Sequence, residues 1–285
     1  MRSAGLIWSA VSGAAATAAA NTTLASRPPG GDGRWTRLNH RGETVSLLEG
    51  PAVAAGLAGA AFLAPGLPRR LRLATVVAAV GAGCLGAYDD LAGSGDRRGF
   101  RGHLGALSRG ELTSGAVKIF GIGATGLVVA AVAGHRGTGL VVSGGVVAAT
   151  ANLVNLLDLR PGRALKAALV LAALDARRGG DTARLAAVAS GCALAALPAD
   201  LGERTMLGDG GANALGAVLG TAVVAARAGA SHGTAGGSTD GRMVRRLAVL
   251  TALTLASEKV SFTRVIDATP GLRELDRAGR RQRTP

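Results

Sequence analysis

Residues 71–90 read "LRLATVVAAVGAGCLGAYDD" and hold the two features that decide how this chain folds. From Leu71 to Tyr88 the stretch is almost entirely apolar, which is about the length that crosses a bilayer as a helix. Two adjacent carboxylates, Asp89 and Asp90, follow at once. The stretch predicts a membrane-spanning helix with a doubled negative charge at the edge of the bilayer. The alternative for the doublet is a simple helix stop facing water.

The composition extends this pattern to the whole chain of 285 residues, of which 48% are hydrophobic. The formal net charge is +14, and the charge lies in short arginine-bearing loops between long Ala/Val/Leu/Gly runs. That block pattern is typical of a multi-pass membrane protein. The 45 glycines fit this class, because small residues let membrane helices approach closely. No recognition motif supports nucleic-acid binding.

Nine apolar segments are predicted to be transmembrane helices. They are residues 4–25, 51–67, 71–88, 114–134, 138–157, 164–176, 183–198, 212–230 and 244–262. The expected fold is therefore an all-α transmembrane bundle of about nine spans (nine to ten) in the cell membrane. Residues 1–262 form a single integral membrane domain, and residues 263–285 form a basic cytoplasmic tail. The sixth segment is the weakest prediction, because a straight span needs about 20 residues.

The arginines predict the orientation. The loop after the first segment carries Arg27, Arg34, Arg37 and Arg41, whereas only Arg2 precedes that segment. Because basic loops stay in the cytoplasm, the N-terminus is expected outside. Alternation then places the 89–113 and 199–211 loops, the 158–163 turn and the tail on the cytoplasmic face. The rival interpretation makes "AAATAAANTTLA" the end of a signal peptide, whose cleavage would invert the topology.

Polar side chains collect on that predicted cytoplasmic face. Besides Asp89 and Asp90, they come from "RLNHRGETVSLLEG" (Arg37 and His40), Lys118, "NLVNLLDLRPG" (Asn152, Asn155 and Asp158) and "MLGDGGANALG" (Asp209). Asn152, Asn155 and Asp158 are spaced so that one helix face carries all three. Polar residues inside a membrane are costly and mark candidate functional sites. The alternative for the asparagines is hydrogen bonding between neighbouring helices.

Clustered carboxylates at a membrane surface suit Mg²⁺, which is commonly held by one or two carboxylates together with substrate phosphates. Gly208, Gly210 and Gly211 surround Asp209 and would let backbone N–H groups approach an anion closely. Lys118, Arg37 and His40 could complete a phosphate clamp. For each basic residue taken alone, the alternative is an anchor on the cytoplasmic side of the membrane.

In chain order, "NHRGETVSLLEG", "GAYDDL", Lys118 after "LSRGELTSG", "NLVNLLDLRPGRA" and "MLGDGGANALG" resemble the motifs of one enzyme family. That family is the polyprenyl-phosphate N-acetylhexosamine-1-phosphate transferases, which include the phospho-N-acetylmuramoyl-pentapeptide transferase. The resemblance covers about residues 35–216. It implies attack of undecaprenyl phosphate on a UDP-sugar, release of UMP and a role in peptidoglycan or another cell-envelope glycan. A homodimer stays open as an assembly.

The resemblance also implies roles for residues. Asp209 and Asp90 would bind Mg²⁺, and Asp89 with Asp90 would orient the lipid phosphate. Lys118 would hold a phosphate. Asn155 and Asp158 would line the nucleotide–metal site.

The chain departs from the family pattern at several positions. Leu159 stands where the family has the first glycine of D-G-x-D-G, and Pro161 stands at its second aspartate. Ala212 replaces a serine, and the late histidine loop is missing. Two other functions therefore stay open. One is a catalytically altered member that binds lipid-linked precursors as a regulator or scaffold. The other is a small-solute or ion transporter, although transporter sites favour the membrane midplane.

Overall fold

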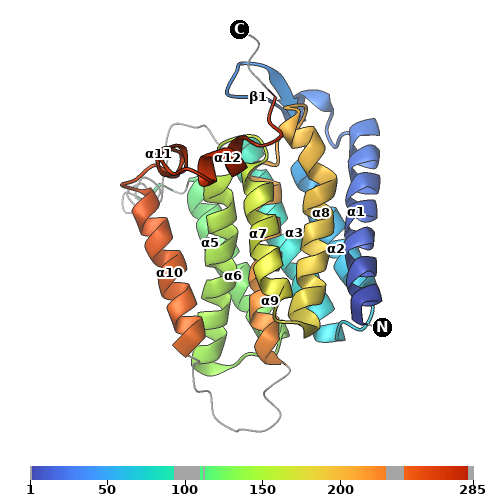
Figure 1. Ribbon diagram of the computed structural model, residues 1–285, viewed down its shortest axis with the longest axis vertical. Helices are drawn as coiled ribbons and strands as arrows, with labels where there is room; N and C mark the ends of the chain where they lie inside the picture. The colour runs from blue at the N-terminus through green and yellow to red at the C-terminus, as the bar shows by residue number, and fades with distance from the viewer. Residues whose placement is uncertain (1, 93–109, 112, 229–240, 282–285) are drawn as a thin grey trace.

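The computed structural model describes residues 2–92, 110–111, 113–228 and 241–281, and these are mostly helical (Figure 1). The long helices are α1 (Arg2–Ser26), α2 (Glu49–Leu63), α3 (Arg69–Ala92), α5 (Ser114–Val132), α6 (Gly137–Leu157), α7 (Arg163–Ala176), α8 (Gly180–Leu201), α9 (Gly208–Ala228) and α10 (Gly241–Ser257). Two short helices follow, α11 (Phe262–Ala268) and α12 (Leu272–Arg277). A 3-10 turn, η1 (Asp32–Trp35), leads into an antiparallel hairpin of β1 (Thr36–Leu38) and β2 (Thr44–Ser46). Apart from this small hairpin, the expected all-α fold is confirmed.

Within the described residues, each of the nine predicted apolar segments overlaps one of the long helices, and these helices differ in length and hydropathy. Among the described residues, five helices are long and apolar enough to cross a membrane, namely α3, α5, α6, α8 and α9. By contrast, α2 and α7 have only 15 and 14 residues, below the roughly 20 that a straight span needs. The structure therefore supports a membrane-type helical protein, while the count of nine spans and the orientation stay predictions.

The bundle is organised around α9, which packs against α2, α3, α6 and α8. Small residues let these helices touch along their backbones. A Cβ added at Gly216 of α9 would lie 2.6 Å from the Ala151 Cα of α6, and one at Gly86 of α3 would lie 2.7 Å from the Gly210 nitrogen of α9. Both positions require glycine, because an added Cβ would clash with the backbone of the neighbouring helix. The expected close packing of small residues is thus present. α10 packs chiefly on α6, at the outside of the bundle (Figure 1).

One end of the bundle gathers the hairpin and the C-terminal segment (Figure 1). Ser46 of β2 bridges to Thr205 after α8, and the backbone carbonyl of Pro161 after α6 accepts a hydrogen bond from Arg280. The hairpin, the 158–163 turn, the 199–211 loop and the C-terminal segment, which alternation assigned to one face, therefore lie together, whereas most of the 89–113 loop lies outside the described residues. Residues 262–281, called the tail below, include most of the predicted basic tail of residues 263–285. They fold as α11 and α12 across this end of the bundle (Figure 1).

Candidate functional site

Three helices place charged side chains in contact at this end of the bundle. Lys118 Nζ, near the start of α5, lies 2.6 Å from Asp89 Oδ2 in the last turns of α3, and it also contacts Asp209 in the first turn of α9. The Thr113 hydroxyl accepts a hydrogen bond from the Ala116 N–H and fixes the start of α5, which sets where Lys118 projects. All three charged side chains are largely buried, at 16% exposure for Lys118 and Asp89 and 29% for Asp209. With Asp90 they form the acid–lysine cluster.

Asp90 has a different role from Asp89. Its Oδ1 accepts a hydrogen bond of 3.1 Å from the Asp209 N–H, and its Oδ2 accepts one of 3.0 Å from the Gly210 N–H. The carboxylate thus satisfies two of the amide groups that have no partner within the first turn of a helix, and it complements the positive end of the helix dipole. Asp90 therefore anchors the start of α9 against the end of α3.

The glycines around Asp209 make this anchoring sterically feasible. Gly208 has φ of +62°, and a Cβ there would lie 2.9 Å from Asp90 Oδ2. A Cβ on Gly211 would lie 2.8 Å from the Gly50 Cα of α2. Gly208, Gly210 and Gly211 were predicted to let backbone N–H groups approach an anion. In this structure the N–H groups of Asp209 and Gly210 donate to the Asp90 carboxylate, whereas the Gly211 N–H donates to the Leu207 carbonyl.

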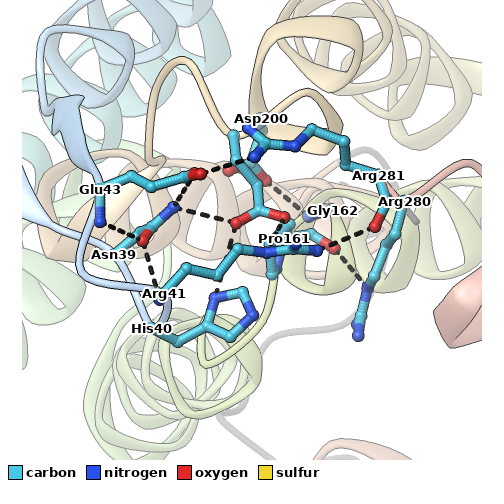
Figure 2. Close-up of polar contacts among 10 residues, drawn as sticks. Asn39, His40, Arg41, Glu43, Pro161, Gly162, Asp200, Arg280 and Arg281 are labelled. Atoms are coloured by element: carbon cyan, nitrogen blue, oxygen red, sulfur yellow. Dashed lines mark hydrogen bonds and ion pairs between the residues drawn. The ribbon is translucent and has the colours of Figure 1, made fainter. Parts of the chain in front are cut away.

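A second group of acidic residues lies beside the cluster. Asp158 caps the end of α6 and lines a cavity of about 210 Å³ together with His40 and Asp200. Asp200 Oδ2 accepts a hydrogen bond of 2.7 Å from the Gly162 N–H, which holds the turn between α6 and α7 (Figure 2). Burial raises the pKa of Asp158 well above its usual range, and the nearby carboxylates of Asp200 and Asp209 raise it further.

The two predicted asparagines are used differently. Asn152 Nδ2 donates a hydrogen bond of 2.9 Å to Thr254 Oγ1 of α10, so this residue joins two helices. Asn155 lies one helical turn before Asp158, and its Oδ1 is buried with no hydrogen-bond partner among the described residues. An unpaired buried acceptor is costly, so Asn155 is the better candidate for contacting a ligand.

Beyond Asp158, the same end of the bundle becomes strongly basic. A cavity of about 550 Å³, called the arginine cavity, is lined by His40, Arg41, Arg160, Pro161, Arg163, Glu203, Asp267, Arg277, Arg280 and Arg281. Burial lowers the pKa of His40, and the cations of Arg160 and Arg41 lower it further against the opposing effect of Glu203. His40 is therefore neutral near pH 7.

The hairpin turn and the tail meet in this cavity (Figure 2). Asn39 Nδ2 donates hydrogen bonds to Glu43 at 3.2 Å and to buried Glu203 at 2.9 Å. Arg281 Nη2 lies 2.6 Å from Glu43 Oε1, and Arg41 donates a hydrogen bond to the Arg281 carbonyl. Arg37 lies exposed on β1 and lines neither of these two cavities.

The tail is held by a buried ion pair. Arg163 donates to both carboxylate oxygens of Asp276 at 2.7 and 3.1 Å, and to Thr263 Oγ1 at 2.7 Å. Lys166 Nζ donates to three backbone carbonyls at the end of α12, including that of Ala278. Arg163 and Asp276 are only 5% and 4% exposed, so the tail is a fixed wall of the arginine cavity.

The acid–lysine cluster has a donor set that fits Mg²⁺ only in part. Asp89 and Asp209 point their carboxylates at one cation, as two carboxylate ligands would. Asp90 is occupied by two N–H groups. In the described part of the chain, no three His, Cys, Asp or Glu residues are placed to hold a metal ion. The residues therefore fit an ion held by two carboxylates and completed by substrate phosphates and water.

Sequence reasoning missed several residues of this region. Asp200 and Glu203 directly follow an apolar run, as Asp89 and Asp90 do, and that signal could have found them. Glu203 also adopts φ of +54°, which is uncommon outside glycine. No local pattern marks Arg163 and Asp276, because 113 residues separate the two partners.

These contacts define what the end of the bundle can do chemically, because function is argued from the site rather than from the fold. A scan against protein-family models matched none of them, and a search of curated proteins found no similar sequence.

Proposed function

We propose that this chain is a multi-pass phosphotransferase of the cell membrane. It transfers an N-acetylhexosamine-type sugar 1-phosphate from a UDP-sugar to undecaprenyl phosphate and releases UMP, in the synthesis of peptidoglycan or another cell-envelope glycan. The observation that carries the proposal is Lys118, shared by Asp89 and Asp209 at the end of membrane-type helices. A lipid phosphate and a water-soluble nucleotide can meet at such an edge of the bilayer.

The chemistry needs positioning and charge neutralisation more than covalent catalysis. An oxygen of the lipid phosphate attacks the β-phosphorus of the UDP-sugar, the bond from that phosphorus to the bridging oxygen breaks, and UMP leaves with this oxygen. Lys118 exchanges a carboxylate partner for a phosphate oxygen. Asp89 and Asp209 are the residues that would hold Mg²⁺, whose charge would neutralise the phosphoryl oxygens. Asp90 positions Asp209 through the start of α9.

The nucleotide side of the reaction is assigned to the neighbouring cavities. Asp158 and Asn155 lie at the end of α6, and His40 and Arg160 line both the Asp158 cavity and the arginine cavity. A guanidinium group binds two phosphate oxygens at once, so the arginines of the cavity are the groups that would hold the diphosphate. A cation-binding cluster beside an anion-binding cavity suits a diphosphate with its metal ion.

The test is release of UMP. Purified protein in detergent is supplied with Mg²⁺, undecaprenyl phosphate and a panel of UDP-N-acetylhexosamines. We expect UMP from at least one of them, and none from Asp209→Asn. Asp181→Asn is the matched control, because Asp181 begins α8 at the opposite end of the bundle and should leave turnover unchanged.

The ion pairs of Lys118 favour a second function. Its ammonium already pairs with both carboxylates that a metal ion would need. A protein with this arrangement could bind lipid-linked precursors through Lys118 without catalysis, as a regulator or scaffold. If no UDP-sugar yields UMP while undecaprenyl phosphate still binds, and binding is lost in Lys118→Gln, the scaffold function replaces the transferase.

The proposed orientation has its own test. A topology reporter inserted after residue 100 is expected in the cytoplasm, where UDP-sugars are made available to the cluster. A reporter found outside would remove the basis for a nucleotide substrate.

A further inference from the structure

Two adjoining apolar cavities run along α7, away from the acid–lysine cluster. The first, of about 410 Å³, is bounded by α6, α7, α9 and α10, and the second, of about 340 Å³, by α6, α7 and the tail. Leu153 and Leu171 line both cavities. From Val146 to Leu157 the shared wall of α6 is roughly 16 Å long, at 1.5 Å of rise per residue. Together the cavities form the α7–α10 groove.

The two ends of this groove offer different charges. At the tail end, Arg163 is paired with Asp276 and Lys166 donates to three carbonyls, so both cations are engaged within the protein. The other end lies where α7 finishes and α10 begins, away from α11 and α12 (Figure 1). Arg178, Arg245 and Arg246 line it.

At this second end, the arginines outnumber the carboxylates that pair with them among the described residues. Arg178 lies 3.2 Å from Asp175. In the portion of the chain that the structure describes, no carboxylate lies within ion-pair distance of Arg245 or Arg246. Two guanidinium groups that have no carboxylate partner among the described residues therefore line one end of a groove with mostly aliphatic walls. A molecule that matches both features has one anionic head and long hydrocarbon chains.

We propose that the α7–α10 groove binds an anionic phospholipid, with its phosphate at Arg245 and Arg246 and its acyl chains along Leu153 and Leu171. The membrane supplies this occupant, because α6 and α9 are both of membrane-spanning length and hydropathy. Guanidinium groups bind phosphate oxygens, and each cation near an anionic lipid head group strengthens binding by roughly fivefold. The inference is independent of the transferase proposal, since the head group lies at the end opposite Lys118.

The test measures lipid binding to the delipidated full-length protein by native mass spectrometry. The probes are dioleoyl phosphatidylglycerol and dioleoyl phosphatidylcholine, which carry the same chains and differ in head-group charge. We expect the wild type to prefer phosphatidylglycerol by roughly 25-fold, or fivefold for each of two arginines. Arg245→Gln/Arg246→Gln should bind the two lipids equally. Arg69→Gln/Arg177→Gln removes the same charge from exposed positions outside the groove and should keep the preference.

An unchanged preference for phosphatidylglycerol in Arg245→Gln/Arg246→Gln would overturn the proposal. If Lys166→Gln then loses the preference, the head group lies at the tail end instead. A Leu171→Asn variant tests the apolar wall, because it should weaken binding of both lipids alike by making that wall polar. The thermal unfolding midpoint of each variant shows that it is folded.

Discussion

The acid–lysine cluster and the arginine cavity lie at the same end of the bundle, yet their charges are balanced in opposite ways. In the cluster, a single lysine serves Asp89 and Asp209. The cavity is lined by six arginines and two carboxylates. Two further carboxylates, Asp276 and Glu43, pair with lining arginines, so the arginines remain in excess. The cluster projects from three long helices that touch through glycine. The cavity is assembled from the hairpin, two loops and the tail. The difference teaches that the first depends on helix packing and the second on docking of the tail, so each can be disturbed alone.

The largest expected effect comes from removing the charge that docks the tail. Asp276→Asn leaves the buried Arg163 guanidinium without its ion partner, and breaking a buried pair in this way costs about 3–5 kcal/mol. We expect the tail to undock, so that hydrogen exchange speeds up at residues 262–281 and not in α3 or α9. Glu274→Gln is the control, because Glu274 lies exposed on the same short helix. Unchanged exchange in the tail would show that the pair does not hold it.

The converse change disturbs the cluster and spares the cavity. In Gly86→Ala, the added Cβ would meet the backbone of Asp209 and Gly210, so α3 and α9 must separate. Overpacking of this kind costs about 1–3 kcal/mol, which should lower the unfolding midpoint in detergent. Gly123→Ala on α5 is the matched control, because no heavy atom lies within 4 Å of its Cβ position. An unfolding midpoint equal to that of the wild type would contradict the packing described here.

Acidification should undock the tail reversibly. Burial alone would raise the pKa of Asp276, but hydrogen bonds and charge from Arg163 outweigh it, and the pKa is lowered. A lowered carboxyl pKa stabilises the folded state above the unfolded value of about 3.9, and this contribution is lost as pH falls through the folded value. Tail protection from hydrogen exchange should therefore persist at pH 5 and fall below about pH 4. Asp276→Asn should abolish this pH dependence.

The smallest expected effect comes from Asp158, which lies between the acid–lysine cluster and the arginine cavity. The pKa of Asp158 is raised by burial and by its acidic neighbours, so ionisation of this group opposes folding. Its effect on stability is absent below the unfolded pKa and grows as pH rises toward the folded one. Asp158→Asn should therefore raise the free energy of unfolding more at pH 8 than at pH 5, by on the order of 1 kcal/mol. Asp181→Asn, at the far end of the bundle, should give no such gain; an equal gain in both variants would refute the assignment.

Part of the site could be predicted from the chain, because its residues lie at or near the ends of apolar runs on one predicted face. Asp89, Asp158, Asp209 and Lys118 were all identified in this way. The different contacts of the adjacent residues Asp89 and Asp90 could not be predicted. Adjacent residues point about 100° apart on a helix, so only the packing of α3 against α9 decides that Asp89 meets Lys118 and Asp90 binds the N–H groups of α9.

The sequence by itself determined the helices and their alternation, because the length and hydropathy of each apolar run are local properties. It also determined that polar groups collect at one end of the bundle. Only the tertiary structure decided that the tail is a wall of the arginine cavity. That docking depends on Arg163 and Asp276, 113 residues apart, whose burial is tolerable only when each neutralises the other. No local sequence pattern encodes such a pair, so only the folded structure reveals that Arg163 and Asp276 are partners.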